Sequence, residues 1–194
     1  PLIIHTLERF EACPAVDEIV LVLSEEGREE FKIQNSKFKI TKLKKVVTGG
    51  ATRAESVRNG LAAIEAADGS IVAVHDGARP LVTPDEIAAV IVKTAETGAA
   101  CLVGPVNDTI KTISGGEIAG TLDRDKLRRA LTPQAFKVEV LRRAFELGDV
   151  SEAVTDECYL VEKLGHPIAF VEGSARNIKI TTREDLVFVE AILG

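Results

Sequence analysis

The chain has no tryptophan and no methionine, and aromatic residues make up only 4% of its 194 residues. Proteins that bind single-stranded nucleic acids stack bases on aromatic side chains, so this scarcity argues against such a function. Positive charge is not in excess either, because the formal net charge is −6 at pH 7. A nucleic-acid-binding surface needs the opposite balance. We therefore expect no nucleic acid partner.

Long apolar runs and paired cysteines are also missing. No run approaches the ~20 apolar residues that span a bilayer, and no signal peptide is visible, so we expect a cytoplasmic protein that does not associate with membranes. Cys13, Cys101 and Cys158 are odd in number and lack metal-ligand spacing, which favours reduced, mostly buried thiols. Because the chain begins at Pro1 and contains no Met, we expect further residues upstream.

Strand-like runs and helix starts alternate along much of the chain. Apolar runs at 18–23, 71–74 and 99–103 are typical of strands that are buried on both faces. Capping boxes at 52–55 and 83–86 mark the starts of helices between them. This alternation predicts an α/β fold with a mostly parallel sheet. No repeat, low-complexity segment or linker interrupts it, so we expect a single domain over the whole chain.

The alternation of strands and helices breaks after the run at 99–103. Residues 109–113 alternate polar and apolar side chains, residues 114–117 form a turn, and an apolar return strand follows at 118–122. A two-stranded hairpin is too small to bury its own apolar face. We therefore predict a β-arm over residues 108–135 that packs on a second copy of the chain and forms a homodimer.

Polar residues directly follow the apolar run at 71–74, in the order His75, Asp76, Gly77, Ala78, Arg79. Open α/β sheets bind their ligands at the carboxyl ends of their strands. Asp76 offers an acceptor or a Mg²⁺ ligand, and Arg79 offers a planar, permanent cation suited to phosphate. The alternative is a plain Asp-Gly turn beside a surface arginine.

A second candidate site lies between the short strand at 46–47 and the helix start that follows it. Gly49 and Gly50 would let a ligand approach the backbone closely, and a helix N-terminus favours an anion or a polar base edge. Arg53 and Ser56 stand just behind the two glycines. A tight turn with no ligand is the alternative at this position.

Common catalytic signatures are missing, since the chain has no dinucleotide fingerprint, no P-loop and no Gly-x-Ser-x-Gly elbow. Several other short motifs occur in one order from the start of the chain to its end, and together they resemble the 2-C-methyl-D-erythritol 4-phosphate cytidylyltransferase family of non-mevalonate isoprenoid synthesis. They lie at residues 50–57, 74–80, 105–111, 123–124, 131–134, 155–157 and 172–181.

The resemblance implies a three-layer, Rossmann-like nucleotidyltransferase fold and a specific reaction. A phosphate oxygen of 2-C-methyl-D-erythritol 4-phosphate would attack the α-phosphorus of CTP, and pyrophosphate would leave, with Mg²⁺ required. Such a transfer depends on positioning and on neutralising two anions that repel each other.

The resemblance also implies roles for individual residues. Lys179, on an expected short strand at 177–180, matches a lysine beside the reacting phosphates, and Asp76 matches the acid at the nucleotide and the metal. The methylerythritol phosphate would be held by Arg79, Thr121 and Thr155, with Arg79 and Thr121 acting across the dimer. Gly50, Arg53 and Ser56 would bind the nucleotide.

Two departures from the family pattern stand out. A family arginine that reaches the substrate phosphate falls at Val138 here, and we expect the adjacent Lys137 to substitute for it, although lysine is a point charge rather than a fork. The family's Gly-rich loop, with the arginine and lysine that clamp the triphosphate, would precede Pro1, and we expect it to lie upstream.

Two other functions stay open at this point. A ribitol 5-phosphate cytidylyltransferase would share the fold and the chemistry and differ only in the polyol phosphate. A catalytically impaired nucleotide-binding protein would bind CTP without releasing pyrophosphate.

Overall fold

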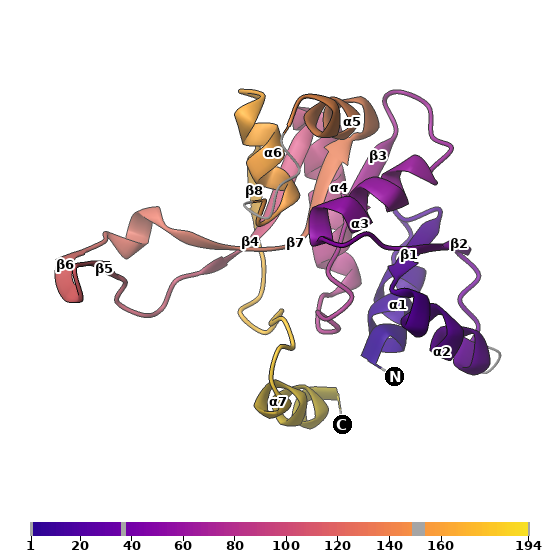
Figure 1. The fold of residues 1–194 in the computed structure, drawn as a ribbon, viewed down its shortest axis with the longest axis horizontal. Coiled ribbons are helices and arrows are strands. Elements are labelled where there is room, and N and C mark those ends of the chain that lie inside the picture. Colours follow the sequence, from indigo (N-terminus) through magenta and orange to yellow (C-terminus); the bar gives the residue numbers. More distant parts are fainter. Residues whose placement is uncertain (1, 36–37, 149–153, 194) are drawn as a thin grey trace.

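The computed structural model describes residues 2–35, 38–148 and 154–193, and Figure 1 shows a layered body from which a two-stranded arm projects. The helices are α1 (Leu2–Ala12), α2 (Glu25–Asn35), α3 (Arg53–Ala62), α4 (Pro84–Thr97), α5 (Val138–Leu147), α6 (Glu157–Lys163) and α7 (Arg183–Leu193), with a 3-10 turn η1 (Arg124–Lys126). The strands are β1 (Ile19–Leu23), β2 (Leu43–Thr48), β3 (Ile71–Val74), β4 (Ala99–Pro105), β5 (Lys111–Ser114), β6 (Glu117–Thr121), β7 (Arg128–Lys137) and β8 (Ala169–Glu172).

The main sheet has four strands in the order β3-β7-β4-β8. Strand β7 pairs antiparallel with both β3 and β4, whereas β4 pairs parallel with β8, so β3, β4 and β8 share one direction. Strands β1 and β2 form a separate parallel pair. The prediction of an α/β fold is confirmed. Three of the four strands of the main sheet share one direction, but the sheet is mixed, because β7 runs antiparallel to both of its neighbours. The reason is that β7 returns from the arm at the end of the sheet where β4 leaves it.

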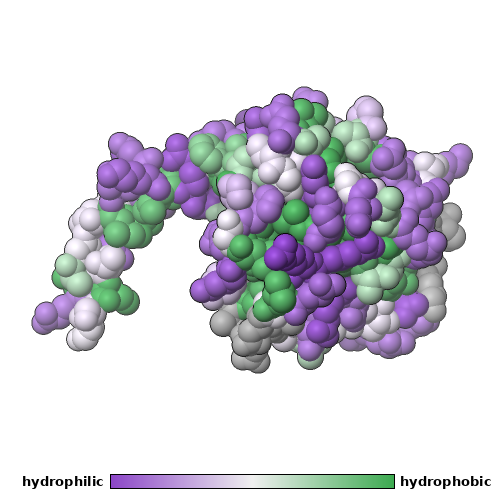
Figure 2. Space-filling view, turned by 90° about the horizontal axis from the view of Figure 1, so that it is seen from above, coloured by the Kyte–Doolittle hydropathy of each residue, from purple (hydrophilic) through white to green (hydrophobic). Residues whose placement is uncertain are grey.

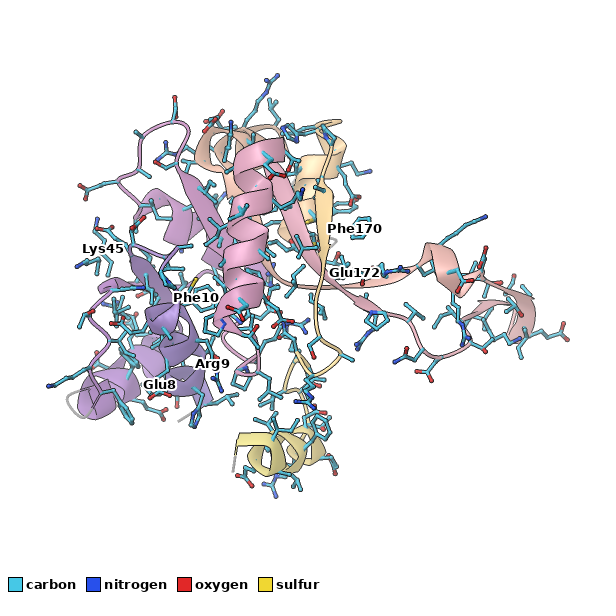
Figure 3. The ribbon with its side chains drawn as sticks, turned by 180° about the vertical axis from the view of Figure 1, so that it is seen from behind. Glu8, Arg9, Phe10, Lys45, Phe170 and Glu172 are labelled. Carbon is cyan, nitrogen blue, oxygen red and sulfur yellow. The ribbon has the colours of Figure 1, made fainter. Side chains whose placement is uncertain are left out.

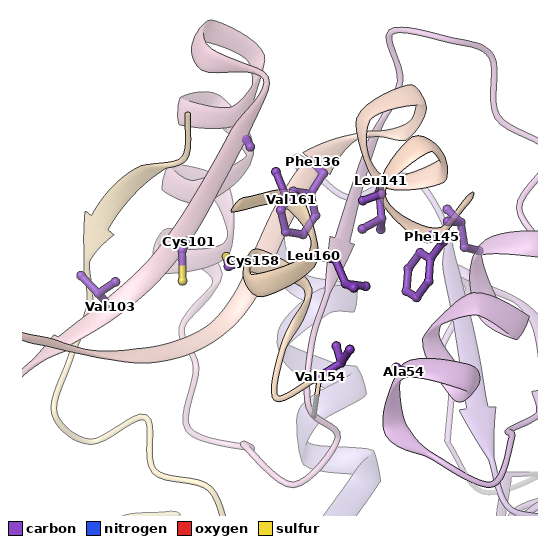
Figure 4. Close-up of a cluster of buried hydrophobic side chains, with 13 residues drawn as sticks. Ala54, Cys101, Val103, Phe136, Leu141, Phe145, Val154, Cys158, Leu160 and Val161 are labelled. Atoms are coloured by element: carbon purple, nitrogen blue, oxygen red, sulfur yellow. The ribbon is translucent and has the colours of Figure 1, made fainter. Parts of the chain in front are cut away.

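Three layers follow from the alternation of side chains along β4. Ala99, Cys101 and Val103 face a buried cluster formed with α3, α5 and α6, which Figure 4 shows in close-up. Ala100 and Leu102 point the other way, into a cluster formed with α1 and α4. Because successive residues of a strand point to opposite faces, the fully apolar strand β4 packs against a layer of helices on each side of the sheet.

The thiols are part of this core. Cys13, Cys101 and Cys158 are all free and buried, as the sequence indicated. In Figure 4, Cys101 on β4 and Cys158 on α6 lie next to each other, and their hydrogen bond together with burial raises the pKa of the Cys158 thiol. They are packing residues of the first cluster.

The helices begin where the capping boxes predict. The hydroxyl of Thr52 accepts a hydrogen bond from the Glu55 backbone N–H, and the hydroxyl of Thr83 accepts one from that of Glu86. Gly98, with a φ of +87°, ends α4 in the left-handed conformation that glycine adopts without strain. Strand β2 is longer than the short strand expected at 46–47 and begins at Leu43.

The arm begins after β4, carries β5, η1 and β6, and returns through the first residues of β7 (Figure 1). Ile113, Ile118 and Leu122 are 78%, 69% and 42% exposed on it. Apolar patches lie along the arm in Figure 2. The predicted arm over residues 108–135 is too long at its C-terminal end, because residues 131–136 are buried in the sheet.

An ion pair ties the base of the arm to the body. The Nε of Arg128, at the start of β7, lies 2.7 Å from a carboxylate oxygen of Glu172 at the end of β8. Figure 3 shows Glu172 beside the point where the arm leaves the sheet. Within the described residues, no helix has both the length and the apolar content needed to cross a membrane.

The α4 cap allows a direct test. Replacing Thr83 by Ala removes the side-chain acceptor at the helix start and should lower the free energy of unfolding by about 1 kcal/mol. Thr83→Ser keeps the hydroxyl and should stay close to wild type. Urea denaturation of the two variants measures the difference, and equal loss in both would show that the hydroxyl contributes nothing.

Candidate active site

Three cations from three parts of the chain converge on the carboxylate of Asp76, directly after β3. Its Oδ1 lies 3.1 Å from the Nε of Arg53, and its Oδ2 lies 3.2 Å from the Nε of Arg79 and 3.3 Å from the Nζ of Lys179. Burial alone would raise the pKa of Asp76, but Arg53 and Lys179, together with a hydrogen bond from Arg79, outweigh it and lower the pKa. Asp76 is therefore an ionised, shielded acid at the carboxyl end of the sheet.

Arg53 is the first residue of α3 and is held by a second acid. Its Nη1 and Nη2 donate to the two carboxylate oxygens of Glu157, at 2.6 and 2.9 Å. The Glu157 side chain has no solvent exposure. Burial raises the pKa of Glu157 and the paired guanidinium opposes that rise. The sequence included Glu157 in a motif of the family resemblance, at 155–157, but assigned it no role, and its pairing with Arg53 was missed.

The segment that carries Lys179 is fixed to the turn after β3 by one side-chain and one backbone hydrogen bond. The Nη1 of Arg79 donates to the carbonyl of Asn177 at 2.9 Å, and the N–H of Ile180 donates to the carbonyl of Ala78 at 2.9 Å. The predicted short strand at 177–180 is wrong, since these residues have no regular secondary structure. Their bonds go to a turn rather than to a sheet partner, yet they bring Lys179 to Asp76 as expected.

His75 supports this turn from the inside. Its Nε2 lies 3.1 Å from the carbonyl of Arg79, and its Nδ1 lies 3.0 Å from the hydroxyl of Thr132. A carbonyl only accepts, so Nε2 carries the proton and Nδ1 accepts from Thr132. The same hydroxyl accepts the N–H of Asp76 at 3.1 Å. The ring also packs on Phe10 of α1, at 4.9 Å between centroids.

A cleft of about 260 Å³ opens beside the converging charges. Gln134 shapes its floor by donating to Asp156 Oδ2 at 2.9 Å and accepting the Cys158 N–H at 3.0 Å. The cleft is lined by Arg53, Asp76, Arg79, Ala130, Leu131, Thr132, Gln134, Thr155, Asp156 and Lys179. Five predicted site residues therefore meet at one cleft: Arg53, Asp76, Arg79, Thr155 and Lys179.

Gly50 and Ser56 lie at the start of α3, where the N–H of Gly50 donates to the Ser56 hydroxyl at 3.0 Å. Neither residue lines the cleft, although Arg53 on the same helix turn does. Both therefore stand next to the charged cluster, at the helix N-terminus that the sequence indicated.

Two predicted substrate residues lie away from the cleft. Thr121 is on the arm, where its hydroxyl lies 2.6 Å from the Nζ of Lys111. Lys137 pairs with Ile71 at the start of β3, whereas Gln134 pairs with Val74 at its end. Three residues of strand span about 10 Å. Within one chain, Lys137 therefore lies away from the cleft, because the antiparallel direction of β7 takes it to the opposite end of β3.

The carboxylates suit a metal that is shared with a ligand. Within the described part of the chain, no three His, Cys, Asp or Glu side chains come together as a metal site. Mg²⁺ is usually bound by one or two carboxylates together with substrate phosphates. Asp76, which faces the cleft with both oxygens already beside cations, fits that arrangement.

Fixed cations gathered around one acid at the carboxyl ends of the strands of an α/β domain suit an enzyme of the nucleotidyltransferase class, which has to neutralise two phosphates. The family model described as 2-C-methyl-D-erythritol 4-phosphate cytidylyltransferase matches residues 1–194. The chain belongs to this family.

Curated relatives and solved structures agree with that assignment. The 2-C-methyl-D-erythritol 4-phosphate cytidylyltransferases of Bacillus velezensis and Halalkalibacterium halodurans are 45% and 42% identical, each over 100% of this chain and over 83% and 85% of the relative. The 4-diphosphocytidyl-2C-methyl-D-erythritol synthase of Anaerococcus prevotii superposes with a TM-score of 0.89 at 29% identity, covering 99% of this chain and 85% of that one. The Francisella tularensis enzyme gives 0.82 at 32% identity, with 98% and 87% covered.

The buried imidazole predicts a pH-dependent stability. Burial lowers the pKa of His75 to about 4, whereas an unfolded histidine titrates near 6.5. Between these values the unfolded chain binds a proton that the folded chain does not. The free energy of unfolding should therefore fall as the pH drops from about 6.5 to 4, by up to about 3 kcal/mol.

Urea titrations of the metal-free protein across this pH range measure the effect. His75→Gln should flatten the slope, and His5→Gln, on the exposed side of α1, should retain it. An unchanged slope in His75→Gln would show that another group causes the acid sensitivity.

Proposed function

We propose that the protein joins CTP and 2-C-methyl-D-erythritol 4-phosphate to give 4-diphosphocytidyl-2-C-methyl-D-erythritol and pyrophosphate. The observation that carries this proposal is the cluster of Arg53, Arg79 and Lys179 around Asp76 at a cleft of the sheet edge. Family membership supports the choice of substrates, and it favours this reaction over transfer to ribitol 5-phosphate. The whole chain would act as one domain, with the arm as its dimerisation element.

The proposed reaction is an in-line exchange at phosphorus. A phosphate oxygen of the polyol phosphate forms a bond to the α-phosphorus of CTP, and the bond from that phosphorus to the bridging oxygen of pyrophosphate breaks. No proton has to leave an ionised phosphate nucleophile, so the protein's task is positioning and charge neutralisation. Lys179, whose side chain is 42% exposed, can turn to the phosphates while Arg79, at 12%, stays fixed.

Mg²⁺ would supply charge neutralisation on the triphosphate and would be held by Asp76 together with phosphate oxygens. Arg79 and Thr155 would hold the polyol phosphate, and Thr121 would reach the site from the partner's arm. Gly50 and Ser56 would contact the nucleoside at the start of α3, with Arg53 below them. A cytoplasmic location is supported by the free, buried thiols.

Asp76 and Lys179 are the residues to test first. Asp76→Asn and Lys179→Ala should each lower the rate of pyrophosphate release by about 100-fold or more, the usual loss when one electrostatic group of a transition state is removed. The measurement is coupled detection of pyrophosphate with CTP, Mg²⁺ and the polyol phosphate. Lys93→Ala, on α4 away from the cleft, is the matched control. Near-normal turnover in either site variant would reject the assignment.

The arm suggests the oligomeric state. We propose a homodimer in which the arms cover each other's apolar residues, since Ile113 and Ile118 are largely exposed on a hairpin with no core of its own. Ile113→Asp combined with Ile118→Asp should shift the protein to monomers in sedimentation velocity and lower turnover. Ser114→Asp, at the hairpin turn, adds charge beside the same strand and should stay dimeric. A wild-type monomer at assay concentration would refute the proposal.

A further inference from the structure

Glu157 is a charged residue in an apolar place. Its side chain is fully buried at the first turn of α6, whose neighbouring residues Cys158, Leu160 and Val161 belong to the core cluster of Figure 4. A buried carboxylate is strongly unfavourable unless a cation pairs with it and its lone pairs are satisfied. Arg53 provides that pairing in bidentate geometry. The fold therefore maintains an acid at some cost, behind the cleft rather than in it.

The geometry shows what this acid controls. All three nitrogens of the Arg53 guanidinium point to carboxylates: Nη1 and Nη2 to Glu157, and Nε to Asp76 Oδ1 at 3.1 Å. A guanidinium is planar and rigid, so fixing two of its nitrogens fixes the direction of the third. Glu157 thereby sets the position from which Arg53 holds Asp76, although residues 53 and 157 are 104 positions apart in the chain.

We propose that Glu157 is a positioning residue that acts through Arg53 to hold the Asp76 carboxylate in place for the metal and the triphosphate. This inference deepens the proposed function and rests on it. Without Glu157, Arg53 would keep only its bond to Asp76, and nothing would fix the direction from which its Nε reaches that acid. The paired state keeps Arg53 directed at the acid and leaves Asp76 Oδ2, which contacts Arg79 and the half-exposed Lys179, as the ligand-facing side.

A purely structural role of Glu157 predicts different results for its variants. If Glu157 only neutralised Arg53, its loss would lower thermal stability and leave the properties of the remaining folded protein unchanged. If Glu157 positions Asp76, the folded variant should lose affinity for CTP in the presence of Mg²⁺ more than in its absence. Partners that orient a metal ligand typically contribute about 10- to 100-fold to metal affinity or activity.

The experiment compares Glu157→Gln, Glu157→Asp and Glu162→Gln in the full-length protein. Glu162 lies on the same helix, is exposed, and controls for the loss of one charge. Calorimetry measures the affinity for CTP with and without Mg²⁺, and steady-state kinetics measure kcat and KM below the melting temperature of each variant. In Glu157→Gln we expect the gain in CTP affinity from Mg²⁺ to shrink by about tenfold or more, and kcat to fall similarly with KM for the polyol phosphate little changed. Glu157→Asp keeps the charge and should recover part of both losses.

A double variant tests the route through Asp76. Because Glu157 acts only by way of that acid, Glu157→Gln added to Asp76→Asn should lower kcat no further than Asp76→Asn alone. Additive losses, or an unchanged Mg²⁺ effect in folded Glu157→Gln and Glu157→Asp, would overturn the inference and leave the proposed function standing. Failure of the wild-type protein to release pyrophosphate would overturn both.

Discussion

The sharing of one carboxylate among three cations is the interaction on which this site depends. Asp76 is 11% exposed, and a shielded acid of this kind stays ionised only while cations accompany it. Those cations come from the start of α3, from the turn after β3 and from the segment before α7, so the same attraction that keeps Asp76 charged also brings distant parts of the chain to one sheet edge. Fold and site are thus held by the same contacts.

Uncharged groups behind these charged side chains hold the residues that carry them in place. The hydroxyl of Thr132 accepts a hydrogen bond from the Asp76 N–H and donates one to His75. The carbonyl of Thr132 accepts a hydrogen bond from the side-chain amide of Asn177 at 2.9 Å. Thr132 can do this because β7 runs against β3 and places its middle residues beside the carboxyl end of that strand. The single antiparallel strand is therefore what lets the return from the arm contribute to the floor of the cleft.

The sequence was informative wherever the signal was local. Capping boxes fixed helix starts, apolar runs fixed β3 and β4, and polar residues directly after a strand located Asp76 and Arg79. Glu157 lay within a motif of the family resemblance, but no local pattern indicated its contact with Arg53, which is 104 residues away in the chain. The position of Lys137, away from the cleft of its own chain, could not be predicted for a related reason: the direction of β7, which no local pattern sets, decides which end of the strand reaches the site. The irregular segment around Lys179 has a strand-like sequence pattern, but its hydrogen-bond partners lie in the turn after β3 rather than in a neighbouring strand.

The charges of the cleft also bear on how such a site accepts an anion. Arg53, Arg79 and Lys179 stand beside three acids, Asp76 and Asp156 in the cleft and Glu157 behind it, so the formal charges of these six side chains cancel, on a chain whose net charge is −6. A phosphate therefore meets no large positive field at first and has to draw a cation away from Asp76. Arg53 is bound on both sides and Arg79 is largely buried, whereas the half-exposed Lys179 loses only one contact. Lys179 is therefore the cation that can turn to an incoming phosphate with the least loss, and Asp76 Oδ2 would then keep its contact with Arg79 alone.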